Sequence, residues 1–406
     1  MQHSSTKRSI FIPGEILGIS CMLLMVYAYG FAPLQPTLTK EFSSPLTALA
    51  IPVFALSFAL AAAGTVLLLR WMQLEQCFLF SLIWLCVGSL LLSMVRSAGA
   101  FLLIRAITGL GTGMMLPTAL MLAPAGRKRG AIASLIMVMF ALGAGMTFGP
   151  SLGGWLNSLW GWRLLYRVLG ILTAVLILLA CLRKGQEEMV RTMHNHYSKA
   201  GNTFRTIWKS RYTYLFVYLT AVFHSGVFVW ISSYFTVQYK LSEYDIANDL
   251  MIFGLPGLVV TFMLYRYHLD SKVLRILYAG LALTIIGLLI LMTNLPLWLA
   301  ECLLAAISIG FSCSQPIFIG ILRMPSTIKP LAIGSAVLFA GYGSGPLAMI
   351  ALLDIHMWVA MTFLIVLVTV LAVVARLVWR QPVLHAKKRH YNHAESPIHV
   401  SQIDVL

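Results

Sequence analysis

Apolar runs of about 20 residues recur along the whole chain and are separated by short polar segments. A run of that length crosses a bilayer as a single helix. Twelve such helices are predicted, near residues 15–36, 46–69, 77–95, 99–123, 131–156, 162–182, 211–236, 246–265, 274–293, 296–321, 331–353 and 357–379. The pattern therefore predicts an all-α membrane protein with twelve transmembrane helices.

The longest polar stretch between two predicted helices divides the twelve into two sets of six. The expected organisation is an N-terminal segment 1–14, a six-helix bundle 15–182, a linker 183–210, a second bundle 211–379 and a tail 380–406. The two sets also repeat each other. Arg266 follows Arg70 by 266 − 70 = 196 positions, and the same spacing relates Gly149-Pro150 to Gly345-Pro346 and Trp162 to Trp358. Serial matches of this kind predict two pseudo-symmetric bundles.

Composition and charge agree with a membrane protein. Hydrophobic residues make up 59% of the 406-residue chain and charged residues only 10%, where a soluble protein carries about a quarter. Most of the 29 Lys and Arg residues fall on the side that both termini share, which predicts cytoplasmic termini by the positive-inside rule. The net charge of +16 therefore reflects topology, and no nucleic-acid partner is predicted.

The fifth predicted helix contains the segment from Gly143 to Gly154, with five glycines and Pro150. Gly145, Gly149 and Gly153 recur every four residues and share one helical face, where a second helix packs at close range. We expect Gly149 and Pro150 to contact a helix of the other half at Gly345-Pro346. The alternative is packing within their own half.

These motifs resemble the major facilitator superfamily. Gly145 to Gly154 is similar to that family's antiporter motif G-x-x-x-G-P-x-x-G-G, and Arg105 to Gly113, with Gly109 and Gly111, resembles its R-x-x-x-G-x-G motif. Ala32-Pro33-Leu34-Gln35-Pro36 resembles the end of the first helix of twelve-span drug:proton antiporters. The resemblance implies two bundles that alternate access to a central cavity lined by helices 1, 4, 7 and 10. One departure is Leu69, which stands where the family has an aspartate that latches the cytoplasmic side.

Ionisable groups inside the predicted helices are costly and are therefore functional candidates. Arg105 and Glu301 occupy roughly equivalent positions near the outer ends of helices 4 and 10, and we expect them to pair when the outer side is closed. The alternatives are a structural role for Arg105 and an interfacial position for Glu301. His224, near the middle of helix 7, is a candidate proton carrier or a neutral histidine bonded to a neighbouring helix.

Aromatic side chains concentrate in helices 1 and 7. Tyr27 and Phe228 are the predicted cavity residues, with Gln315 as a polar partner, whereas Tyr29, Trp230 and Tyr234 are expected in the interfacial aromatic belt. Aromatic walls suit an amphiphilic substrate. No catalytic set, metal cluster or phosphate-binding loop is found in the sequence, so neither an enzyme nor a cofactor is predicted.

The sequence thus predicts a secondary active transporter that exports a small amphiphilic compound in exchange for protons. A proton-coupled importer or facilitator and a transporter-like sensor are the alternatives. The expected partners are the small-molecule substrate, protons and the lipid bilayer. The expected setting is a monomer in a bacterial inner membrane.

Overall fold

The computed structural model describes residues 12–124, 131–182, 208, 210–266, 273–314 and 328–380. The first half contains α1 (Gly14–Tyr29), α2 (Gln35–Phe42), α3 (Ala50–Leu68), α4 (Leu74–Leu92), α5 (Ala98–Thr112), α6 (Met115–Leu122), α7 (Ala131–Trp160) and α8 (Arg163–Leu182). The second contains α11 (Arg211–Tyr239), α12 (Glu243–Arg266), α13 (Val273–Leu291), α14 (Leu297–Ser312), α16 (Ile328–Ile355) and α17 (Met357–Trp379). Two 3-10 turns, η1 (Ala32–Leu34) and η2 (Pro45–Leu49), complete the described elements.

The predicted fold class, a two-bundle helical membrane protein, is confirmed. Within the described ranges, eleven helical segments are long and apolar enough to cross a membrane, and α14 is a shorter apolar helix. Large apolar side chains such as Leu60 and Met94 are more than 70% exposed. Exposed apolar bands of this kind face lipid, where they cost nothing. The predicted linker 183–210 lies almost entirely outside the described residues, as do Gln315 and most of the tail.

Two predicted spans are not single helices. The first breaks after Gly30 because Pro33 and Pro36 lack the amide hydrogens that a continuing helix needs, and it resumes as α2 to Phe42, beyond the predicted end. The fourth divides into α5 and α6 at Gly113 and Met114. By contrast, α7, α12 and α16 run through Pro150, Pro256 and Pro346 without interruption.

The internal repeat extends to individual contacts between helices. A Cβ atom on Gly145 would meet Met22, and one on Gly149 would meet Val26 and Gly30, all on α1. At the 196-residue spacing, a Cβ on Gly341 would meet Tyr218, and one on Gly345 would meet Val222 and Gly226, all on α11. The close packing of α7 on α1 is therefore duplicated in the packing of α16 on α11.

This packing corrects one prediction. Gly149 does not approach Gly345-Pro346, because the nearest atoms to a Cβ at Gly149 all belong to α1 of the same half. The glycine face of α7 and the matching face of α16 are each covered by the first helix of their own bundle. The halves meet instead through α7 against α12 and α3 against α16.

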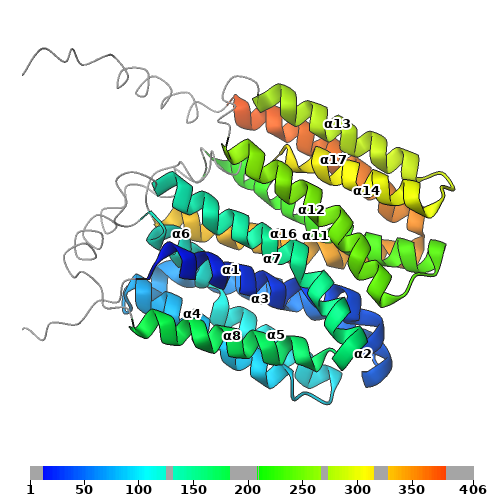
Figure 1. The fold of residues 1–406 in the computed structure, drawn as a ribbon. Helices are drawn as coiled ribbons and strands as arrows, with labels where there is room; N and C mark the ends of the chain where they lie inside the picture. The colour runs from blue at the N-terminus through cyan, green and yellow to red at the C-terminus, as the bar shows by residue number, and fades with distance from the viewer. Residues whose placement is uncertain are drawn as a thin grey trace, which may run out of the picture.

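Figure 1 shows α4, α5 and α8 on one side, α13, α14 and α17 on the other, and the remaining helices between them. The start of α1 and the end of α17 lie at the same end of the bundle (Figure 1). We call this the proximal end and the opposite one, where α2 lies, the distal end. The buried core extends through both bundles and across the contact between them, which includes the stacked rings of Phe58 and Phe339 at 3.6 Å.

Candidate functional site

A cavity lies between the two halves, bounded by α7 on one side and by α11, α12 and α14 on the other. Tyr342 of α16 also contributes to its wall. The cavity holds about 60 Å³, which is room for a few water molecules at roughly 30 Å³ each. Sites for drug-sized ligands measure about 300–1,000 Å³. In this conformation the halves therefore leave too little space for such a ligand.

The cavity wall is apolar with a few polar groups. Phe140, Phe253, Phe311 and Met146 supply the apolar part, and Thr147, Thr220, Ser308, Ser312 and His224 supply the polar part. The hydroxyl of Thr220 donates to a carbonyl of its own helix, that of Phe216, at 2.7 Å. A wall of this kind fits an amphiphilic ligand with few polar groups.

His224 is the wall's ionisable side chain. Its ring lies 5.5 Å from that of Phe228, 5.8 Å from Phe311 and 6.3 Å from Phe253, measured between centroids. The structure gives it no hydrogen-bond partner among the described residues, so the alternative of a histidine bonded to a neighbouring helix is not observed. His224 is therefore available to a ligand in the cavity.

The aromatic predictions turn out differently for individual residues. Phe228 is fully buried beside the cavity and contacts the ring of Tyr29 across the two halves at 5.8 Å. Tyr29, expected in the interfacial belt, is buried at this contact and also meets Tyr342, at 5.9 Å. Tyr27, predicted in the cavity, packs inside the first bundle against Phe54 at 5.2 Å.

Trp230 and Tyr234 also lie away from the expected belt. Their rings stack on each other at 4.8 Å, and both side chains are buried. The hydroxyl of Tyr234 donates to the carbonyl of Leu291 at the end of α13. Both side chains are therefore enclosed by the second bundle instead of facing lipid.

Arg105 is completely buried within the first bundle. Its Nη1 donates to the carbonyl of Tyr27 at 2.7 Å, Nη2 to that of Ala28 at 3.0 Å, and Nε to that of Ala50 at 3.2 Å. These carbonyls lie at the end of α1 and the start of α3. Arg105 thus holds three helices together, which is the structural role left open by the sequence.

The predicted Arg105–Glu301 pair is absent in this conformation. Arg105 uses its guanidinium on backbone carbonyls, whereas Glu301 lies on α14, which packs against α12, the helix that carries Asp249. Asp249 is only 2% exposed, and its Oδ2 has no hydrogen-bond partner among the described residues. The sequence reading missed Asp249, although an aspartate inside the predicted helix 246–265 was the signal that should have marked it.

Polar contacts join the halves at the distal end. Glu243, the first residue of α12, accepts hydrogen bonds from the amide and hydroxyl of Thr37 at 3.1 and 2.6 Å and from Nδ2 of Asn157 at 2.7 Å. Nearby, Trp155 Nε1 donates to Asn248 Oδ1 at 2.8 Å, and Ser151 Oγ donates to the carbonyl of Ala247 at 3.0 Å. We call Thr37, Asn157 and Glu243 the distal clasp. It was not predicted, because its members come from three separate segments.

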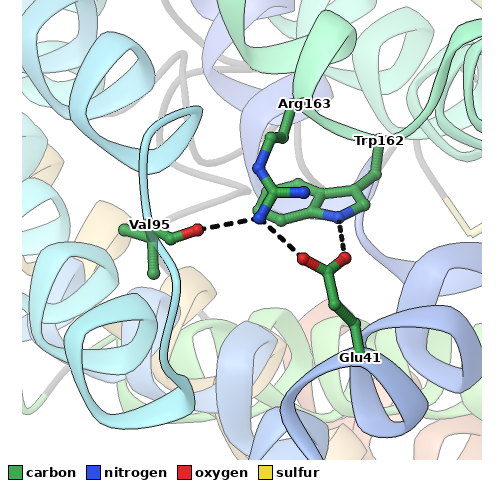
Figure 2. Close-up of polar contacts among 4 residues, drawn as sticks. All are labelled: Glu41, Val95, Trp162 and Arg163. Carbon is green, nitrogen blue, oxygen red and sulfur yellow. Dashed lines mark hydrogen bonds and ion pairs between the residues drawn. The ribbon is translucent and has the colours of Figure 1, made fainter.

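A second polar cluster positions α2 for this contact. Figure 2 shows Glu41 accepting from Trp162 Nε1 at 2.7 Å and from Arg163 Nη2 at 2.6 Å, while Arg163 Nη2 also donates to the carbonyl of Val95 at 3.0 Å. Glu41 and Thr37 are four residues apart and so share one face of α2. Glu41 anchors α2 to its own half, and Thr37 reaches the other.

The proximal end differs in its chemistry. Arg70, the charged residue retained in the loop between α3 and α4, is exposed and makes no ion pair with any described residue. Leu69 ends α3 with its amide bonded to the carbonyl of Thr65. Within the described ranges, polar contacts between the halves are concentrated at the distal end.

Comparison with known proteins agrees with this architecture. The family model described as Major Facilitator Superfamily matches residues 17–324. Among solved structures, the chain resembles the crystal structure of the human organic anion transporter MFSD10 (TETRAN), with a TM-score of 0.69 and 13% sequence identity. The match covers 89% of this chain and 98% of that one. No curated protein matches the sequence.

Proposed function

We propose that this protein exports a small amphiphilic molecule in exchange for protons. The chain belongs to the Major Facilitator Superfamily and is therefore a membrane-embedded secondary transporter. In this family, transport proceeds by rocking one bundle against the other around a site between them. The proposal adds direction, coupling ion and substrate class to the family assignment.

The observation that carries the proposal is the cavity between the halves. It lies where a rocking movement of the two bundles would enlarge it, and its wall combines phenylalanine rings with His224 and several hydroxyls. Such a wall accepts an apolar body and satisfies one or two polar groups of the ligand. The substrate class we infer is therefore amphiphilic rather than a sugar or a multiply charged metabolite.

The direction follows from the glycine motif and the expected topology. Gly145 to Gly154 has the spacing that is typical of antiporters in this superfamily. With both termini cytoplasmic, as the charge distribution predicts, the distal clasp closes the cavity toward the outside. Release to the outside then requires the clasp to open. We also propose the inner membrane of a bacterium as its setting.

The test is transport by the purified protein in proteoliposomes with an imposed pH gradient. Three probes cover the possible charges: ethidium as a cation, fluorescein as an anion and chloramphenicol as a neutral molecule. We expect at least one probe to accumulate against its own gradient, driven by protons moving the other way, and the accumulation to collapse when a protonophore is added. Transport that does not depend on the pH gradient would identify a facilitator. Transport of the probe in the same direction as protons would identify an importer.

His224 is predicted to form a hydrogen bond with a transported polar probe and so to raise the binding affinity for it. Replacing it with phenylalanine keeps a ring against Phe228 and Phe311 but removes the polar edge. Loss of one hydrogen bond costs about 1 kcal/mol, so the apparent affinity for a transported polar probe should fall roughly fivefold. Direct binding measurements on His224→Phe and His224→Gln check this, and equal affinities in all three proteins would remove His224 from the binding site.

A further inference from the structure

Asp249 is a buried carboxylate inside a membrane-spanning helix. Its side chain is 2% exposed, and no described residue donates a hydrogen bond to Oδ2. An ionised carboxylate in such a place loses the hydration of Oδ2 without a hydrogen bond in exchange, and binding a proton reduces that cost. Asp249 therefore differs from Glu243, whose carboxylate on the same helix accepts hydrogen bonds from Thr37 and Asn157.

The charged groups that act on Asp249 are two more carboxylates, Glu301 of α14 and Asp245 of its own helix. Asp245 is exposed and accepts a hydrogen bond from the hydroxyl of Ser242 at 2.6 Å. The other elements packed on this part of α12 bring no compensating cation. The helix α7 and the turn η1 contain no Asp, Glu, Lys, Arg or His. The helix α11 contributes His224, whose ring meets Phe253, and carries Arg211 at its opposite, proximal end. Lys240 is exposed in the turn between α11 and α12.

The position of Asp249 connects it with both the cavity and the contact between the halves. Phe253, a cavity residue, follows one helical turn later, about 6 Å along the axis. Ala247 and Asn248, in the same turn as Asp249, receive the hydrogen bonds of Ser151 and Trp155 from α7. One turn of α12 thus holds a buried carboxyl group beside residues that bind the other half.

We propose that Asp249 is the site at which the coupling proton binds. The inference rests on the proposed proton exchange but concerns a defined carboxyl group. When the proton is bound, Asp249 is neutral and α12 packs on α14 as observed. When the proton leaves to water, two like charges meet between α12 and α14, and the turn carrying Ala247 and Asn248 shifts.

Carbodiimide labelling tests this site without knowledge of the substrate. Dicyclohexylcarbodiimide reacts with protonated carboxyl groups in apolar surroundings, and mass spectrometry locates the adduct. In the full-length protein in liposomes, we expect an adduct at Asp249 that is lost as the pH is raised and is absent in Asp249→Asn.

Two outcomes of labelling would overturn the inference. One is an unreactive Asp249 at every pH in the folded protein, with normal reaction after unfolding in detergent. The other is an adduct at Glu301 in place of Asp249. Neither outcome bears on whether the protein exports an amphiphile, because transport is measured separately with ethidium, fluorescein and chloramphenicol.

Transport measurements on Asp249 variants provide a second test. For whichever probe the wild type moves, Asp249→Asn should lose accumulation driven by the pH gradient and retain exchange of labelled for unlabelled probe. Asp354→Asn, which removes an exposed carboxylate at the end of α16, is the control and should keep both activities. Asp249→Glu, which retains a carboxyl group, should keep part of the driven accumulation, and undiminished driven transport by Asp249→Asn would show that the proton binds elsewhere.

Discussion

At the scale of single residues, Arg105 shows how a charge is accommodated in the membrane. Its three nitrogens donate to three backbone carbonyls, and four aromatic rings surround the guanidinium, with those of Tyr27 and Phe31 at 5.0 and 5.5 Å. The carbonyls of Tyr27 and Ala28 need donors because α1 ends there and the following proline turn does not supply them. The negative end of the α1 dipole adds a favourable interaction.

We predict that Arg105→Ala destabilises the protein, because three carbonyls lose a buried donor at about 1–3 kcal/mol each. Arg105→Lys should recover only part of the loss, since one ammonium group does not reproduce the geometry of the guanidinium. Thermal unfolding in detergent, followed by size-exclusion chromatography, measures both. The charge swap Arg105→Glu with Glu301→Arg serves as a control, and recovered stability in that double variant would contradict the structural role.

At the scale of the helices, α7 has two neighbouring glycines that face different partners. A Cβ on Gly153 would overlap the backbone of Gly30, in the same bundle, whereas a Cβ on Gly154 would meet Ala247 and Glu243 of the other bundle. The first contact lies within one bundle, so rocking of the bundles as rigid bodies should preserve it. The second exists only while the distal end is closed, because rocking separates α7 from α12 there.

This difference predicts opposite phenotypes for adjacent substitutions. Gly153→Val should lower the stability and abundance of the protein by overpacking α7 against α1, at about 1–3 kcal/mol. Gly154→Val should leave abundance near normal and favour the state with an open distal end. Abundance is measured by quantitative blotting, and opening by cysteine accessibility at Asn248→Cys. If both variants lose abundance equally, Gly154 also packs within the fold in every state.

At the scale of the whole molecule, the two halves are in contact along their length, but polar bonds join them mainly at the distal end. The clasp carboxylate receives hydrogen bonds from two different elements, α2 and α7. A hydrogen bond to a charged group contributes about 1.5–3 kcal/mol. Breaking one therefore changes the balance between closed and open states about tenfold or more, since 1.4 kcal/mol corresponds to a factor of ten.

Thr37→Val is predicted to shift the population toward an open distal end by about tenfold. Spin labels at Lys40→Cys and Tyr244→Cys, both exposed positions, report the distance between the halves by electron resonance. The matched control is Thr39→Val, because Thr39 bonds Thr47 within its own half at 2.6 Å. An unchanged distance distribution in Thr37→Val would show that the clasp does not hold the distal end closed.

Much of the architecture was determined by the sequence alone. Lipid demands apolar helices of a set length, so the twelve spans could be read as apolar runs. Duplication left matching glycines and prolines, so the two bundles could also be recognised. Gly145, Gly149 and Gly153 identified a close packing face because four-residue spacing places them on one side of a helix.

The tertiary structure alone decided which partner each of these groups meets. The face of α7 that carries Gly145, Gly149 and Gly153 packs on the end of α1 in the same half. Gly154 lies on a different face of α7 and meets α12 of the other half. Arg105 could not be assigned from sequence, since its acceptors are backbone carbonyls and any helix end offers them. The clasp and Asp249 depend on contacts between α7, α12 and α14, which are distant along the chain. Hydropathy records that a residue is buried, whereas its partners follow from how the helices pack.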